Sequence, residues 1–262
     1  MIYLAVADLV QRYDDHEAPS RSDQLSRYEL RCFSQHGEDG IIAEVLHRVG
    51  SINGYFVEFG IESGREGNCV FLADVCDWHG IFIEPDASAF AALARKYAGN
   101  PGVRTLRSAV TPENVLKLFS DHGVPREADV LSIDVDGADY WIWEAIDTQR
   151  YHPRVVVIEY NAALPVDARM VQPRDHPAGW NGTAYFGASL QALIELGERK
   201  GYRFVHTDMS GANAFFVRAD LGAERFPSLP TAPRRGEPNY FMTGYHHPPD
   251  EAGHEYVDPG PR

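Results

Sequence analysis

Short apolar segments alternate along this chain with segments of helical periodicity. The strand-like segments span residues 55–59, 80–84, 103–110, 128–134 and 154–160. The last two are rich in β-branched residues and show no polar alternation, as expected of strands buried on both faces of a parallel sheet. Helical patterns lie between the strand-like segments, at residues 66–78, 85–99 and 111–123. The alternation predicts an α/β fold with a Rossmann-like, doubly wound sheet and helices on both faces.

The last third of the chain predicts a different end to this sheet. An amphipathic helix at residues 189–201 leads into strands at 202–208 and 213–218, which only the sequence MSGA separates. So short a link makes a hairpin, and the last strand is therefore expected to run antiparallel to its neighbour. The predicted sheet has seven strands, five of parallel type followed by this terminal hairpin.

The pattern divides the chain into three parts. Residues 1–40 are expected to form an N-terminal helical extension, and residues 41–219 the core. Residues 220–262 are rich in proline and polar residues, which predicts an arm or a tail. The histidines of this tail are expected to be solvated: His246, His247 and His254. The alternatives are metal binding by these histidines and a tail that folds over the cleft or a neighbouring subunit.

Composition limits the partners of the protein. A length of 262 residues with 44% hydrophobic content suits one domain with an ample core. A formal net charge of −14 disfavours contact with nucleic-acid phosphates, so a small-molecule partner is expected and nucleic acid is not. The apolar opening MIYLAVADLV is interrupted by Asp8 and too short to span a bilayer, and the three cysteines form no CxxC pair. We therefore expect a cytoplasmic protein with no membrane partner, and a homo-oligomer is left open.

The first two apolar segments both end in acidic residues. The first is followed by spaced glycines in YFVEFGIESGREGN, and the second is GIFIEPD, which places Glu84 at the end of a strand. Glycines let a ligand approach the backbone, and a carboxylate at the second strand's end accepts hydrogen bonds from ribose hydroxyls. This pair of motifs predicts a nucleoside-containing ligand, and alone it fits a nicotinamide cofactor as well.

Five motifs in order, over residues 33–218, resemble the FkbM-type S-adenosylmethionine-dependent small-molecule O-methyltransferases. They are FSQHGEDGII, VEFGIESGREGN, GIFIEP, LSIDVDGADYW, and FGASL with GYRFV and NAFFVR. The resemblance implies the class I methyltransferase fold, S-adenosylmethionine as cofactor, and methyl transfer to a hydroxyl of a sugar, nucleoside or secondary metabolite. The chain departs from the family's first motif at Glu62, where the middle glycine is usual.

The resemblance also implies where the cofactor binds. The methionine half is expected over Glu58 and Gly60, the ribose at Glu84, and the adenine at the ends of the second and third strands. Asn68 either bonds the cofactor or caps a helix, and Gln35 belongs to a segment, 34–40, that either caps a helix or closes as a lid. The predicted cofactor-binding residues are Gln35, Glu58, Gly60, Glu62, Gly64, Asn68, Glu84, Pro85, Asp86, Ser108, Ala109 and Asp134.

Acidic residues gather at the ends of the fourth and fifth predicted strands, which meet at one crevice. The spacing is similar to that of catechol and macrocin O-methyltransferases, which hold a divalent cation there. Carried over, it implies a metal site of Asp134, Glu159 and Asn161, although Asn161 lies one position late. Oxygen ligands of this kind suit Mg²⁺, Ca²⁺ or Mn²⁺.

Two mechanisms remain open at these acids. A metal would lower the pKa of the acceptor hydroxyl, whereas without one Asp136 or Asp139 is the candidate base. Helix capping and turn formation are the third alternative for the predicted catalytic residues, which are Asp134, Asp136 and Asp139. Two other functions also stay open, a NAD(P)-dependent oxidoreductase and a non-catalytic nucleoside-cofactor-binding protein. The sequence shows no Tyr-x-x-x-Lys proton relay after the fourth strand, which disfavours the oxidoreductase. The acidic residues at the strand ends disfavour the non-catalytic protein.

Overall fold

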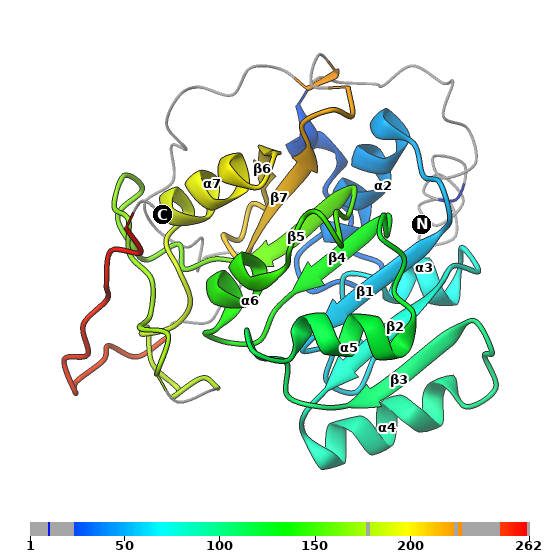
Figure 1. Cartoon of the computed structure of the whole chain (residues 1–262), viewed down its shortest axis with the longest axis horizontal. Coiled ribbons are helices and arrows are strands. Elements are labelled where there is room, and N and C mark those ends of the chain that lie inside the picture. Colours follow the sequence, from blue (N-terminus) through cyan, green and yellow to red (C-terminus); the bar gives the residue numbers. More distant parts are fainter. Residues whose placement is uncertain (1–9, 11–23, 177–178, 223–224, 227–246, 261–262) are drawn as a thin grey trace.

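A seven-stranded mixed sheet forms the centre of the protein (Figure 1). The computed structural model describes residues 10, 24–176, 179–222, 225–226 and 247–260. The strand order is β3-β2-β1-β4-β5-β7-β6, in which β7 is antiparallel to β5 and β6 and the other pairs are parallel. The strands are β1 (Tyr55–Phe59), β2 (His79–Glu84), β3 (Val103–Arg107), β4 (Val130–Ile133), β5 (Val155–Glu159), β6 (Tyr202–Thr207) and β7 (Asn213–Arg218). The predicted Rossmann-like fold with its terminal hairpin is confirmed.

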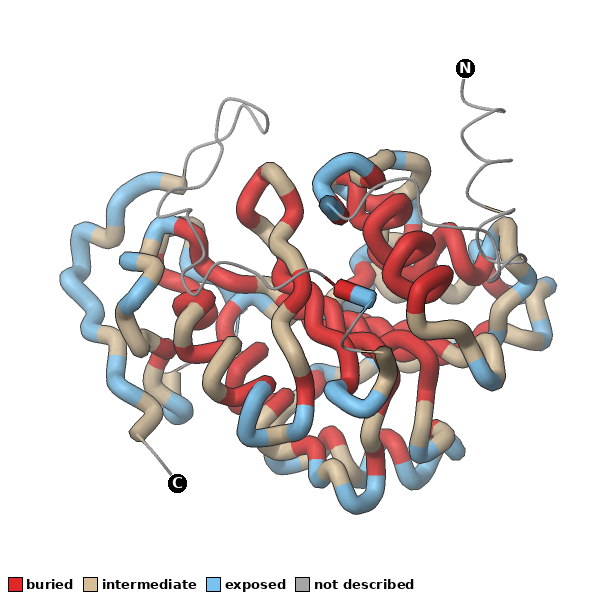
Figure 2. Tube along the Cα trace, turned by 90° about the horizontal axis from the view of Figure 1, so that it is seen from above, coloured by how far each residue is buried: buried red, intermediate tan, exposed pale blue. Residues whose placement is uncertain are grey.

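Helices cover both faces of the sheet because alternate strand residues point to opposite sides. Phe56 and Phe82 pack in one core with α2, α3 and α4, whereas Phe59 and Ile133 pack in a second core with α5, α6 and α7. Figure 2 shows the buried strands running through the middle of the molecule. The helices are η1 (Leu25–Tyr28), α2 (Glu38–Val49), α3 (Val70–Asp74), α4 (Ala87–Tyr97), α5 (Val115–His122), α6 (Asp139–Ala145) and α7 (Leu190–Arg199).

Two elements are shorter than their sequence patterns predict. The helix expected over 66–78 is reduced to α3, because Gly67 has a φ of +157° and the next two N–H groups bond a side chain instead of the helix. The strand expected over 103–110 ends at Arg107, beyond which Ser108 and Ala109 turn toward α5. Both differences leave room at the carboxyl ends of the strands.

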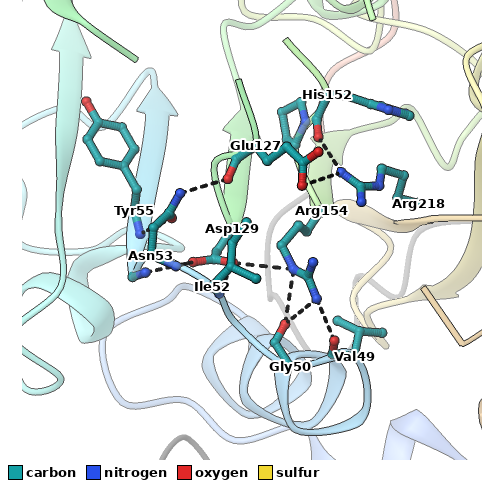
Figure 3. A network of polar contacts seen from close by, with 12 residues as sticks. Val49, Gly50, Ile52, Asn53, Tyr55, Glu127, Asp129, His152, Arg154 and Arg218 are labelled. Carbon is teal, nitrogen blue, oxygen red and sulfur yellow. Dashed lines mark hydrogen bonds and ion pairs between the residues drawn. The ribbon is translucent and has the colours of Figure 1, made fainter. Parts of the chain in front are cut away.

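A polar network fastens the opposite end of the sheet (Figure 3). The carboxylate of Asp129 accepts hydrogen bonds from the backbone N–H groups of Ile52, Asn53 and Gly54 at 2.7–3.0 Å. Arg154 lies 3.4 Å from the same carboxylate and donates to the carbonyl oxygen of Gly50. Because Asp129 is fully buried, these bonds offset the loss of its hydration and fix the entry into β1.

The last described segment, residues 247–260, docks on the loop after β5. Val257 and Val171 form an isolated antiparallel bridge, and the hydroxyl of Tyr256 accepts a hydrogen bond from the Phe186 N–H. Residues 1–9 and 11–23 of the expected extension and 227–246 of the expected tail lie outside the described residues. Within the part that is described, no helix is long and apolar enough to cross a bilayer. The three-part division, the cytoplasmic location and an oligomer stay predictions.

Candidate functional site

A cavity of about 690 Å³ opens at the carboxyl ends of β1, β2, β4 and β5. The strand order reverses between β1 and β4, and ligands of open α/β sheets bind at such a reversal. Of the twelve residues predicted to bind the cofactor, all but Gly64 line this cavity. Gly64 instead packs the turn against α4, since a Cβ there would lie 2.7 Å from Leu93 Cδ1.

Glu58 is committed to the turn that leads into α3. Its Oε1 accepts a hydrogen bond from the Asn68 N–H at 2.7 Å, and its Oε2 accepts one from the Cys69 N–H at 2.9 Å. Burial raises the pKa of Glu58 to about 7 against the lowering effect of these bonds. Asn68 in turn donates from its side chain to Ser132 Oγ at 3.0 Å, so it links β4 to this turn rather than capping a helix.

Glu62 has a backbone conformation that glycine adopts more readily than other residues. Its φ is +53°, in the left-handed region that glycine adopts most readily. The strain is offset by a hydrogen bond from the Glu62 N–H to Glu84 Oε2 at 2.7 Å. The departure from the glycine-rich pattern therefore leaves the turn intact and adds a carboxylate to the cavity wall.

Glu84 ends β2 between two backbone donors. Besides the Glu62 N–H, it accepts the Asp86 N–H at 2.7 Å on Oε1. Asp86 caps α4, because its Oδ1 accepts from the N–H groups of Ser88 and Ala89 at 2.9 and 2.8 Å. Each oxygen of Glu84 retains a lone pair for a further donor, which suits a pair of ribose hydroxyls.

Three carboxylates converge at the ends of β4 and β5. One oxygen each of Asp134, Asp136 and Glu159 lies within 4.8 Å of the others. Burial and mutual repulsion hold the pKa values of Asp134 and Glu159 well above their usual range. Glu159 Oε2 is buried with no hydrogen-bond partner among the described residues. Such a cluster suits either a divalent cation or a shared proton.

Two predicted roles at this cluster need correction. Asp139 does not face the cluster as a free base, because its two oxygens accept the N–H groups of Val135 and Gly137 at 2.8 Å each. Burial raises its pKa to about 6. Its contacts shape the loop in which Asp136 has a φ of +57°.

Asn161 does not join the three carboxylates as a third ligand. Its Nδ2 donates to the carbonyl oxygens of Ala184 and Phe186 at 2.9 and 3.0 Å, and its Oδ1 accepts the Ala163 N–H at 3.0 Å. The side chain therefore holds the loop after β5. Asp136 takes the third position in the cluster.

The expected lid segment, residues 34–40, is held in a closed turn beside the cavity. Asp39 Oδ2 accepts the N–H groups of Cys32, Phe33 and Ser34 at 2.7–2.8 Å. Glu38 Oε2 accepts the His36 N–H at 2.8 Å. The segment therefore does both things that were expected of it. It stabilises the start of α2, and its Gln35 and Glu38 line the cavity.

A second cavity of about 300 Å³ adjoins the first. The two share Gln35, Asp134, Glu159 and Asn213. Its outer wall is aromatic, with the rings of Phe186 and His247 centred 5.2 Å apart and Trp180 beside His247. His247 was expected to be solvated, and this expectation is wrong, because the segment after residue 246 packs on the loop after β5.

Sequence reasoning missed Asn213, Phe186 and His247. Asn213 stands directly opposite Glu159 in the β5–β7 register, so an alignment of the hairpin against β5 would have found it. Phe186 and His247 lie in irregular segments, where the sequence carries no periodic signal.

No protein-family model matches the chain, and no curated protein matches it either. Solved structures with a similar arrangement include the pyocyanin biosynthetic protein PhzM, at 12% identity and a TM-score of 0.40 over 68% of this chain. The chain spans about half of PhzM, 54% of its length. Fibrillarin from Aeropyrum pernix with natively bound S-adenosyl-L-methionine matches at 9% identity, a TM-score of 0.41, and 66% and 70% of the two chains.

A third similar structure is an S-adenosylmethionine-dependent methyltransferase from Clostridium acetobutylicum ATCC 824. It matches at 7% identity with a TM-score of 0.40, over 67% of this chain and 87% of that one. Similarity at this level concerns the fold and transfers no activity or residue role. The function is therefore argued from the geometry of the site.

Proposed function

We propose that the protein is an S-adenosylmethionine-dependent methyltransferase that methylates a hydroxyl of a small molecule. The observation that supports it most is the pairing of Glu58 with the turn into α3. In dinucleotide-binding folds, N–H groups at this place bind a pyrophosphate. Here a carboxylate occupies two of them, which disfavours NAD and leaves a site for a cofactor without phosphate.

The charge of the main cavity supports a cationic cofactor. Among the described residues that line it, nine are acidic and none is lysine or arginine. A sulfonium carries a positive charge that such a wall attracts, whereas two phosphates would be repelled. The nine acids are Glu38, Glu58, Glu62, Glu66, Glu84, Asp86, Asp134, Asp136 and Glu159.

The residues at the cavity fit the parts of this cofactor. Glu84 would accept both ribose hydroxyls, and the backbone at Gly60 would lie against the methionine half. Pro85, Ser108 and Ala109 would border the adenine. The transferred methyl belongs to the cofactor's sulfonium, so the chain's own task is to align the acceptor and take up its proton.

Asp134 is the residue we assign to proton uptake. It borders both cavities, and burial raises its pKa, which makes its carboxylate a stronger base than that of an exposed aspartate. Asp136 lies beside it on the surface and would share this role, whereas Asp139 would position the loop.

The same carboxylates also fit a divalent cation. The partnerless Glu159 Oε2 and the oxygens of Asp134 and Asp136 form an oxygen-only donor set of the kind that Mg²⁺ prefers. A cation bound there would lower the pKa of the acceptor hydroxyl. We include it as metal assistance to the proposed reaction.

Titration calorimetry of the full chain with S-adenosylmethionine and, separately, with NAD tests the proposal. Saturable binding of S-adenosylmethionine and of its demethylated product is expected, with no heat from NAD. Binding of NAD in the absence of S-adenosylmethionine binding would overturn it.

A further inference from the structure

The second cavity presents hydrogen-bond acceptors toward its interior. Glu159 Oε2 and Asn213 Oδ1 are both buried, and neither has a hydrogen-bond partner among the described residues. Both side chains line this cavity together with Asp134. Leaving a buried acceptor unpaired is unfavourable, so a ligand that donates hydrogen bonds would stabilise the site.

Asn213 is held in one orientation by its other side. Its Nδ2 donates to Glu38 Oε1 at 2.9 Å, and Glu38 itself holds the His36 N–H. This bond fixes the orientation of the side-chain amide, so Oδ1 is the atom that remains free to accept a hydrogen bond from a ligand. Asn213 is 5% exposed, and it stands opposite Glu159 across β5 and β7, where side chains share one face of the sheet.

The described wall of the cavity offers no permanently charged cation to balance a negative charge on the ligand. No lysine or arginine occurs among the described residues that line it, whereas Asp134 and Glu159 do. Its histidines are His36 and His247, and neither carries a permanent positive charge. A phosphate or carboxylate in this cavity would therefore lie beside the acidic groups of Asp134 and Glu159, with no lysine or arginine as counter-ion.

We propose that the second cavity is the acceptor site, that it selects an uncharged, hydroxyl-bearing acceptor against anionic ones, and that Asn213 Oδ1 determines this specificity by accepting a hydroxyl hydrogen. The proposal rests on the proposed methyl transfer and specifies its acceptor. A volume of about 300 Å³ corresponds to roughly ten water molecules, which fits an acceptor of monosaccharide size. The aromatic wall of Phe186 and His247 would cover its apolar face.

The first experiment compares matched acceptors on the full-length protein. Binding of S-adenosylmethionine is measured first by calorimetry, which tests the proposed function separately. Methyl transfer from radiolabelled S-adenosylmethionine is then measured with a panel of neutral monosaccharides and nucleosides, each paired with its phosphate monoester. Transfer to at least one neutral member is expected, with its phosphate at least about ten-fold slower.

Three results separate the proposals. A phosphate ester methylated as fast as its parent would overturn the acceptor specificity. So would the absence of transfer to every neutral member by a protein that binds S-adenosylmethionine. Absence of S-adenosylmethionine binding would instead overturn the methyltransferase function itself.

The second experiment replaces the proposed specificity residue. Asn213→Leu keeps the side-chain size and removes the acceptor oxygen together with the Nδ2 bond to Glu38, so KM for the neutral acceptor is expected to rise about ten-fold or more. The dissociation constant for S-adenosylmethionine is expected to change less than about three-fold. Gln191→Leu likewise replaces a side-chain amide with an apolar group, on α7 and outside both cavities, and is expected to leave KM unchanged.

A purely structural role for Asn213 would affect kcat, KM and cofactor binding together. An unchanged acceptor KM in Asn213→Leu would overturn the assignment. If that variant does not fold, the neutral and phosphorylated pairs on the wild-type protein still decide the specificity.

Discussion

Gly60 approaches Asp134 so closely that a Cβ on residue 60 would lie 1.6 Å from the Asp134 carbonyl oxygen. The two residues follow β1 and β4, the adjacent strands between which the sheet reverses its order. Gly60 also has a φ of +72°, so both space and backbone conformation require a glycine. This contact brings the turn that carries Glu62 against the strand end that carries the acidic cluster.

Gly60→Ala is therefore expected to disrupt the site. The methyl group overlaps backbone rather than a flexible side chain, so one of the two strand ends must shift. We expect a loss of stability above about 2 kcal/mol, together with loss of cofactor binding. Urea unfolding and calorimetry measure the two effects.

Gly123→Ala is the matched control for this change. Gly123 has a φ of +67°, and a Cβ there would meet nothing within 4 Å. Its replacement by alanine measures only the loss of stability that comes from the left-handed backbone conformation, about 1 kcal/mol. Equal destabilisation by the two variants would show that the approach to Asp134 adds nothing.

Glu84 and its neighbour Asp86 are expected to differ in their effect on cofactor affinity. Glu84→Gln exchanges one acceptor oxygen for a donor, so S-adenosylmethionine binding is expected to weaken at least about ten-fold, and the loss of one backbone hydrogen bond also lowers the stability. Asp86→Ala removes the cap of α4 and is expected to lower the stability with little change in affinity. Calorimetry and urea unfolding on both variants check the pair, and a loss of affinity in Asp86→Ala that equals the loss in Glu84→Gln would contradict it.

Glu58 is expected to make the stability depend on pH. Its pKa is 4.5 in an ordinary environment and about 7 in the folded protein, so the native state binds its proton more tightly than the unfolded chain. Its contribution is therefore most favourable below pH 4.5 and is lost as the pH rises to about 7, by up to ~3 kcal/mol. Urea unfolding at pH 5 and at pH 7.5 measures this fall.

Glu58→Gln removes the titrating group and is expected to flatten this part of the profile, whatever its effect on absolute stability. Glu66→Gln changes a half-exposed carboxylate on the same turn, paired with Arg31, and is expected to keep the wild-type profile. A profile that is equally steep in Glu58→Gln and the wild type would exclude Glu58 as the source.

The sequence predicted the sheet well because most of its strands are buried on both faces. Continuous apolar runs and a hairpin link of four residues leave few alternatives for the strand order. Glu84 was found for a related reason, since an acid that ends a predicted strand must lie at the carboxyl edge of the sheet. Apolar runs, a short hairpin link and an acid at the end of a strand can each be recognised from a few neighbouring residues.

The acidic cluster could be predicted only in part, because a polar side chain at a strand end can bind either a ligand or the backbone of a nearby loop. The sequence predicted Asp139 as a candidate base, but its side chain accepts hydrogen bonds from the backbone two and four residues before it. The sequence predicted Asn161 as a metal ligand, but its side chain donates a hydrogen bond to a loop more than twenty residues later. Spacing places a side chain at a strand end, but it does not reveal which competing donor lies within reach.

Metal binding by the cluster of Asp134, Asp136 and Glu159 is the last expectation. Glu159 Oε2 is partnerless, so Mn²⁺ is expected to bind the wild-type protein, as measured by electron paramagnetic resonance without any substrate. Glu159→Gln and Asp134→Asn each remove a charged donor and are expected to weaken binding at least about ten-fold.

Asp121→Asn changes a carboxylate paired with Lys117 on the surface of α5 and serves as the control, with unchanged Mn²⁺ affinity expected. EDTA is expected to slow methyl transfer in the same preparation. If EDTA leaves methyl transfer unchanged and the protein binds no Mn²⁺, the reaction needs no cation. Asp134 would then take up the proton alone. The two outcomes also differ in Glu159→Gln, because Glu159 is needed to hold a cation but not for proton uptake by Asp134.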